Sequence, residues 1–237
     1  MIARSSSRHS AFTLLELLSV VAIVSVLAVI LIPVAQRSIV AGKTTASLSN
    51  LRQIGVGINS YLSENNGLYP VLQNSSTNPP SGFWSQAVTP YLGSPDEGNI
   101  YLLNPPKYLV SKVLMDPLLS SGKHHFLGDY GGNAEVFRND DPGNYYFPQL
   151  RTATVNKPSR LVSVATAEYL YSGTTVGAWY IDTYNFIQQG SALAASRPQP
   201  SFRANGTILA LFCDGHTEAI SKKQFIDNRT QYLKLNP

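Results

Sequence analysis

The feature that most constrains this chain is an apolar run near its N-terminus, residues 12–35, written FTLLELLSVVAIVSVLAVILIPVA. Between Leu17 and Ile32 its only polar residues are Ser19 and Ser25. About 20 apolar residues in one helix are enough to cross a bilayer once. The sequence therefore predicts a transmembrane helix over residues 12–35, which we call the stem, followed by a part that lives in water.

One carboxylate, that of Glu16, lies inside the stem. A carboxylate in hydrocarbon costs roughly 2.5–3.5 kcal/mol on insertion scales, so it needs a partner or a function. One reading is that Glu16 snorkels to the headgroups at the helix end. The other is that it pairs with a positive charge in the membrane, which removes the cost of leaving it alone.

The leader, residues 1–11 (MIARSSSRHSA), contains Arg4 and Arg8 and no acidic residue. Basic residues beside a transmembrane segment tend to stay cytoplasmic, so we expect the N-terminus inside and the C-terminal part outside. A secretory signal is cleaved after its apolar run. Here the apolar run is followed directly by a further predicted helical segment. Cleavage before the run, or no cleavage, therefore fits the sequence better than cleavage after it.

The sequence AFTLLE, residues 11–16, followed by the apolar run and Pro33, resembles the N-terminus of type IV pilins and type II secretion pseudopilins. The resemblance implies a prepilin leader peptidase that cuts between Ala11 and Phe12 and methylates the new amine of Phe12. With Phe12 as the first mature residue, Glu16 is the fifth and Pro33 the twenty-second, as in that family. The family prefers Gly where this chain has Ala11.

The same resemblance implies that Glu16 guides subunit assembly. In a membrane, the carboxylate of Glu16 on one subunit can lie near the amine of Phe12 on its neighbour. An α-amino group has an ordinary pKa of roughly 7.7–8.0, so it can carry the opposite charge. Such a pair would set the axial register of adjacent stems.

Residues 36–66 are predicted to continue the helix as an amphipathic segment. Pro33 removes one intrahelical hydrogen bond and predicts a kink there. The helix should end near residues 65–67 (Asn-Asn-Gly), because Gly is favoured just past a helix end. Gly42, Gly55 and Gly57 each weaken the helix by about 1 kcal/mol relative to Ala. Apolar residues recur at three- and four-residue steps: Leu48, Leu51, Ile54, Ile58, Tyr61 and Leu62.

Residues 67–237 are predicted to form a loop-rich α+β head, with an antiparallel sheet packed against the second half of the long helix. Strands are predicted at residues 161–166 and 178–181. The strongest hairpin signal is residues 208–213, then Asp214-Gly215, then residues 216–220, with a two-residue type I′ turn.

The phrase NGTILALFCDGHTEAI, residues 205–220, resembles the end of a large group of bacterial pilin-like proteins. That group carries a His ten residues before the Asp-Gly pair. Here the position is Ala204, with Arg203 just before it, so no role of that His is carried over.

Candidate metal ligands compete with plain turn chemistry. Asp214, His216 and Glu218 could hold a cation, but Asp at a turn more often serves backbone geometry. Residues 140–144 (DDPGN) lack the ligand spacing of an EF-hand. Calcium in a head loop is the one cofactor that the resemblance would allow; no other cofactor is expected.

Other reactive or aromatic side chains are expected to be structural. His124 and His125 are predicted to lie in an exposed loop. Cys213 ends an apolar strand and is expected in the core rather than as a nucleophile. Trp84 and Trp179 could form a ligand-binding surface or belong to the core. No G-x-S-x-G or phosphate-cradling glycine loop is present.

The chain is therefore predicted to be a structural subunit and not an enzyme, in a type II secretion pseudopilus or a type IV pilus-like filament. Its partners would be like subunits, the leader peptidase, an inner-membrane assembly platform and lipid; no nucleic acid is indicated, because Lys and Arg form no run. It would cross the bacterial inner membrane once, with a periplasmic head. Two alternatives are a minor adhesive or DNA-capturing pilin and a membrane-tethered enzyme.

Overall fold

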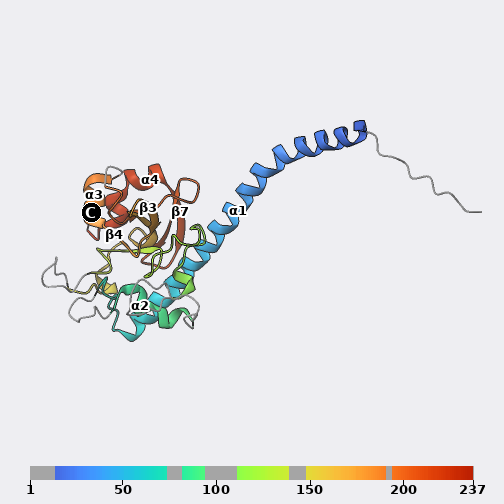
Figure 1. Cartoon of the computed structure of the whole chain (residues 1–237). Coiled ribbons are helices and arrows are strands. Elements are labelled where there is room, and N and C mark those ends of the chain that lie inside the picture. The colour runs from blue at the N-terminus through green and yellow to red at the C-terminus, as the bar shows by residue number, and fades with distance from the viewer. Residues whose placement is uncertain (1–13, 74–81, 94–110, 139–147, 191–193, 237) are drawn as a thin grey trace, which may run out of the picture. The chain divides into compact units, whose positions relative to one another are not determined.

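The computed structural model describes residues 14–73, 82–93, 111–138, 148–190 and 194–236 (Figure 1). The chain divides into two compact units, Met1–Gly42 and Lys43–Pro237. One helix, α1 (Leu14–Glu64), contributes to both. A long N-terminal helix followed by a sheet-containing unit confirms the predicted α+β class.

In the first unit, α1 continues through Pro33. The proline ring leaves no N–H to donate to the preceding turn, so one rung of the helical hydrogen-bond ladder is missing at this position. The kink at Pro33 stays a prediction.

The end of α1 lies where the residues 65–67 predict it. Asn66 and Gly67 both have positive φ, 53° and 71°. The amide of Gly67 donates to the carbonyl of Leu62 at 2.8 Å, which satisfies one of the carbonyls left over at the helix end. This is the six-to-one hydrogen bond of a Schellman cap, with Asn66 in the left-handed position.

The second half of α1 packs through the predicted stripe. Leu51 and Ile54 are fully buried. Gly55 and Gly57 lie on opposite flanks of this stripe: a Cβ on Gly57 would lie 2.7 Å from Leu92 Cδ2, and one on Gly55 3.0 Å from Leu211 Cδ1. Two residues that weaken the helix by propensity therefore let it approach its neighbours closely.

The second unit carries a seven-stranded sheet in the order β4-β1-β2-β6-β7, with β3 and β5 also pairing with β2. Pair β1–β4 is parallel and the other pairs are antiparallel, so the sheet is mixed rather than antiparallel as predicted. The strands are β1 (Tyr130–Asn133), β2 (Val162–Tyr171), β3 (Thr174–Gly177), β4 (Tyr180–Ile181), β5 (Gln199–Pro200), β6 (Thr207–Phe212) and β7 (Thr217–Ser221).

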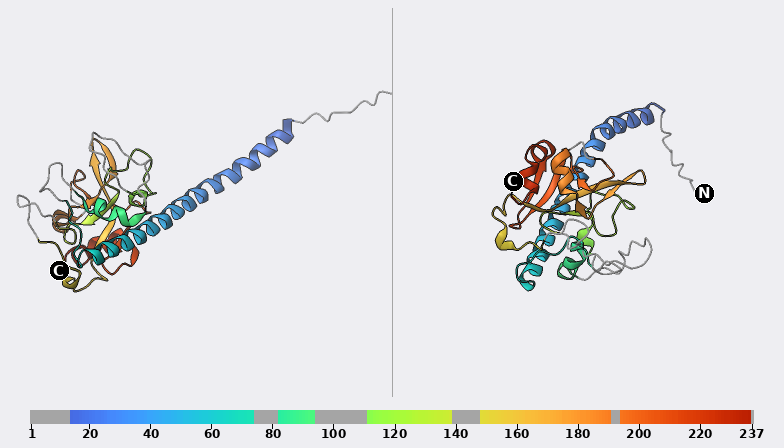
Figure 2. Two further views of the ribbon diagram at one scale, coloured as in Figure 1. Left: turned by 90° about the horizontal axis from the view of Figure 1, so that it is seen from below. Right: turned by 90° about the vertical axis from the view of Figure 1, so that its left-hand side faces the viewer.

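Short helices surround this sheet (Figures 1 and 2). They are α2 (Trp84–Val88), η1 (Thr89–Leu92), η2 (Lys112–Leu114), η3 (Thr152–Thr154), α3 (Thr183–Gln189), α4 (Lys222–Asp227) and α5 (Arg229–Leu233).

Strand β6 shows that both faces of the sheet are covered. Leu209 and Leu211 belong to the core cluster that contains Leu51 and Ile54 of α1. The alternate residues of β6 belong to a second cluster with Phe186 of α3, Phe225 of α4 and Leu233 of α5. The sequence predicted only the layer formed by the long helix; α3, α4 and α5 supply a further layer on the opposite face.

The β6–β7 hairpin differs from the expected type I′ turn. Its connection has three residues, 213–215, closed by a hydrogen bond from the amide of Phe212 to the carbonyl of His216 at 2.9 Å. Gly215 has φ of 92°, whereas Asp214 keeps an ordinary negative φ. A type I turn followed by one left-handed residue is the common three-residue hairpin, and it asks for glycine only at its last position.

Replacing Leu51 by Ala is expected to destabilise the second unit by about 2–5 kcal/mol, because it empties a fully buried site between α1 and the sheet. Urea unfolding of the detergent-solubilised full chain, followed by tryptophan fluorescence, measures the effect. The matched control is Val56→Ala, at a side chain 65% exposed on the same helix, with an expected change within about 0.5 kcal/mol. Equal losses would contradict the packing described.

Candidate functional site

The first candidate site is the apolar part of α1, residues 14–34. Every Leu, Ile and Val side chain from Leu14 to Val34 is at least 51% exposed. An 18-residue window of α1 is long and apolar enough to cross a membrane, and none of it is buried against the rest of the described chain. Fully burying one such side chain is worth about 1.5–3 kcal/mol. A surface of this kind requires a cover of lipid or protein.

The two polar residues inside the run do not disturb this surface. The hydroxyl of Ser19 donates to the carbonyl of Glu16 at 2.9 Å, and that of Ser25 donates to the carbonyl of Val21 at 2.7 Å. Each hydroxyl therefore satisfies its donor within the helix. In a medium without water, polar groups have to be satisfied in this way.

Glu16 lies in the first turn of α1. The unpaired amides at a helix N-terminus favour a negative charge there. Ala11 and Phe12, the residues of the expected cleavage site, lie outside the described residues.

Comparison with known families bears on the N-terminal part of the chain. Residues 6–32 match the prokaryotic N-terminal methylation motif. The matched range contains the expected cleavage site, Glu16 and most of the exposed apolar surface. It supports a pilin-like subunit processed in the manner of a prepilin, and it points to a structural role. Neither the curated proteins nor the solved structures gave a match.

The residues at the hairpin tip interact with one another. His216 Nδ1 lies 2.5 Å from Asp214 Oδ1, and its ring stacks on Phe212 with centroids 4.2 Å apart. Glu218 follows on β7 and is exposed. Among the residues that the structure describes, no group of three His, Cys, Asp or Glu side chains is placed to hold a metal ion. Residues 140–144 lie outside those described.

Cys213 is half-buried at the edge of the core, and Trp84 lies inside the core, one of the two alternatives that the sequence left open for it. Burial raises the pKa of the Cys213 thiol to about 12, so the thiol stays protonated and is a poor nucleophile. Trp84 is fully buried and stacks on Phe137 with centroids 5.0 Å apart. Its indole donates to the carbonyl of Trp179 at 2.6 Å.

The prediction of an exposed loop for the two histidines is wrong in one respect. They do lie in a loop, but His125 is buried and His124 half-buried. The reason is Asp129, a fully buried carboxylate that collects hydrogen bonds from this loop. It lies 2.5 Å from His124 Nδ1 and accepts from the amides of His125 and Asp116, each at 2.9 Å.

A second buried charge pair lies beside Asp129. The carboxylate of Asp116 faces the guanidinium of Arg203 at 3.3 Å. Arg203 also donates to Ser201 Oγ at 2.8 Å and to the carbonyl of Ala167. Burial raises the pKa of Asp116, and the charge of Arg203 opposes that shift. No local pattern predicts this cluster, because its members are spread over some 90 residues and follow no motif.

Gly177 is the one local signal that accompanies the cluster. A Cβ at this position would lie 2.0 Å from Asp129 Oδ1, so the strand end must be glycine for the carboxylate to fit. The cluster also reaches α1 through Tyr130, whose hydroxyl is 2.9 Å from Ser47 Oγ. These contacts fix the loop of residues 111–129 against both the helix and the sheet.

Acid should destabilise the second unit through His125. Burial lowers the pKa of His125 to about 4, from an ordinary value near 6.5. The unfolded chain therefore binds this proton first, and up to about 3 kcal/mol of stability is lost as the pH falls from 6.5 to 4. His124 acts in the opposite sense: its hydrogen bond to Asp129 raises its pKa, so its contribution is present below pH 6.5 and is lost at higher pH.

We expect His125→Asn to flatten the fall in unfolding free energy between pH 6.5 and 4, since the Asn oxygen can still accept from the amide of Leu127. Urea titrations of the full chain at several pH values measure the slope. His216→Asn, at the exposed hairpin tip, is the control and should keep the slope of the original chain. An unchanged slope in the His125 variant would refute the assignment.

Proposed function

We propose that this chain is a pilin-like structural subunit, processed before Phe12 and assembled through its N-terminal helix into a type II secretion pseudopilus or type IV pilus-like filament. One observation carries the proposal: the methylation motif at residues 6–32 covers the part of α1 whose apolar side chains are exposed. The motif supports the processing, and the exposed surface supports the assembly.

In this proposal, lipid surrounds the stem before assembly and neighbouring stems surround it afterwards. Lipid tails are as apolar as Leu, so burial alone gives little preference for stems over lipid. A specific interaction has to favour the assembled state, and the pair between Glu16 of one subunit and the Phe12 amine of the next supplies it. In a low dielectric such a pair is strong only when both ions are present.

Orientation and partners follow from the charge distribution. Arg4 and Arg8 of the leader favour a cytoplasmic N-terminus, and this supports a periplasmic location for residues 67–237. The leader peptidase acts on the membrane-inserted chain, and an inner-membrane platform moves processed subunits into the filament. The processed chain has no leader arginines, which otherwise would have to be drawn into the membrane with Phe12.

Processing is tested by the intact mass of the chain extracted from membranes. We expect loss of residues 1–11 and one added methyl group on the Phe12 amine, because the small side chain of Ala11 fits where glycine is preferred. Ala11→Gly should accelerate the cleavage, and Ala11→Leu, with a bulky side chain at the cut, should block it. A mature chain that still begins at Met1 would overturn the processing step.

Assembly is tested by Glu16→Leu. We expect the variant to insert and to be cleaved but to form fewer filaments by at least tenfold in electron micrographs, because the subunits lose their register contact. Ser19→Leu, three residues along the same run, adds a similar apolar side chain while keeping Glu16, and should form filaments normally. Equal filament yields for Glu16→Leu and the unchanged chain would show that the carboxylate has no assembly role.

A further inference from the structure

A turn in the second unit brings the backbone of two basic residues, Lys157 and Arg160, close together. The amide of Arg160 donates to the carbonyl of Lys157 at 3.0 Å, so residues 157–160 form a β-turn. Pro158 occupies its second position, where proline fixes the backbone in advance. The first and fourth residues of such a turn have Cα atoms within about 7 Å. The turn therefore anchors two exposed basic side chains at neighbouring positions of the backbone, and two positive charges near one another favour a bound anion.

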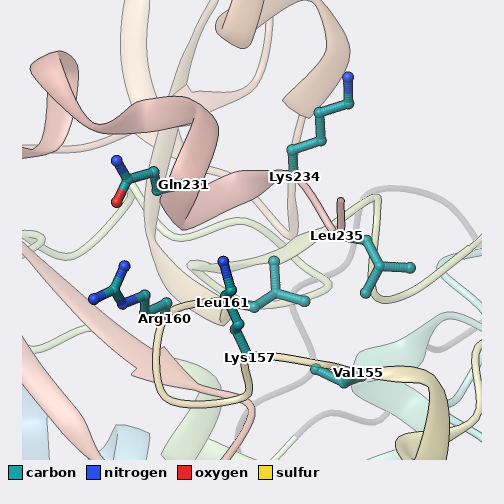
Figure 3. Close-up of a pocket in the computed structure, with 7 residues that line it drawn as sticks. All are labelled: Val155, Lys157, Arg160, Leu161, Gln231, Lys234 and Leu235. Carbon is teal, nitrogen blue, oxygen red and sulfur yellow. The ribbon is translucent and has the colours of Figure 1, made fainter. Parts of the chain in front are cut away.

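These cations line a hollow of about 220 Å³ (Figure 3). Its apolar floor is made by Leu161, which is 3% exposed, with Val155 and Leu235 beside it. Figure 3 shows Lys157 and Arg160 rising from one loop toward the side on which Gln231 of α5 lies. Lys234 also lines the hollow, but its amine points away from the other two cations.

The positive charges that line this hollow are not neutralised by ion pairs within the described residues. Within the described residues, none of Lys157, Arg160 and Lys234 forms an ion pair with a carboxylate. Among the described residues that line this hollow or an adjoining one of about 310 Å³, the one acidic side chain is that of Glu218, in the adjoining hollow that Arg160 and Gln231 also border. The net charge of the two hollows together is therefore positive.

We propose that the smaller hollow binds a carboxylate joined to a short apolar group, as in the C-terminal residue of a polypeptide or a small N-blocked amino acid. The forked guanidinium of Arg160 matches the two oxygens of a carboxylate. The Lys157 ammonium adds charge, and the Gln231 amide adds a neutral hydrogen-bond donor. The apolar side group rests on Leu161, Val155 and Leu235.

The size and lining of the hollow select this chemistry over other anions. A volume of about 220 Å³ is below that of a pocket for a drug-sized ligand, roughly 300–1,000 Å³, and suits a single residue. Inorganic phosphate has no apolar part to cover the floor.

The test uses the full chain in neutral detergent micelles, with ¹⁵N amide shifts recorded during titration. The probes are N-acetyl-L-leucine and a tetrapeptide ending in Leu, each as free acid and as amide, with inorganic phosphate as a further probe. We expect the free acids to shift amides of residues 155–161 and 229–235, and the amidated probes to bind at least tenfold more weakly. A peptide acid that binds more tightly than N-acetyl-L-leucine identifies a polypeptide end as the source; equal affinity identifies a small molecule.

Three variants make the test specific. Lys157→Gln combined with Arg160→Gln removes two exposed charges without touching the core, and should weaken the free acids at least tenfold. Lys157→Arg keeps the charge and should retain most of the binding. Lys123→Gln removes an exposed cation elsewhere in the second unit and should bind as the original chain does. The proposal would be overturned if the free acids bound no better than the amides, or if phosphate bound as tightly as the free acids. It would also be overturned if the free acids still bound to the double variant. No residue of the stem lines this hollow, so the outcome of this test does not bear on the proposed filament assembly.

Discussion

Burial of apolar surface by a single helix is the constraint on which the rest of this structure depends. Along its first part, α1 exposes aliphatic side chains on all sides; along its second part it buries one stripe against a sheet. The two parts are therefore suited to different surroundings. A helix apolar all round suits lipid or the interior of an assembly, and an amphipathic helix suits the edge of a water-soluble unit.

The second unit accommodates the helix by small residues and by a sheet covered on both faces. Gly55 and Gly57 give α1 its close approach, and β6 sends alternate side chains to α1 and to α3–α5. Asp129 accepts backbone amides of the loop of residues 111–129, and Asp116 of the same loop pairs with Arg203. Buried charges of this kind are tolerable only when they are paired and hydrogen-bonded.

The parts of the fold that the sequence predicted are those with local patterns. The stripe from Leu51 to Leu62 has helical spacing, and the cap at residues 65–67 has the residue types that positive φ requires. The second layer was missed, although the uninterrupted run ILALF of β6 is what a strand buried on both faces requires. The stem was recognisable from length and hydropathy alone. The charged cluster and the basic hollow were not, since both join residues that are distant in sequence and depend on which loops the sheet brings together.

The internal hydrogen bonds of Ser19 and Ser25 have a mechanical consequence. With their hydroxyls turned onto their own backbone, the sides of this helix present almost only dispersion contacts, which depend weakly on rotation and sliding. In the proposed assembly, the axial position of each helix would be set at the end that carries Glu16, and the rest of its length would slide and rotate against its neighbours with little resistance. Filaments made this way would bend and stretch at little energetic cost while resisting slippage from one lock to the next.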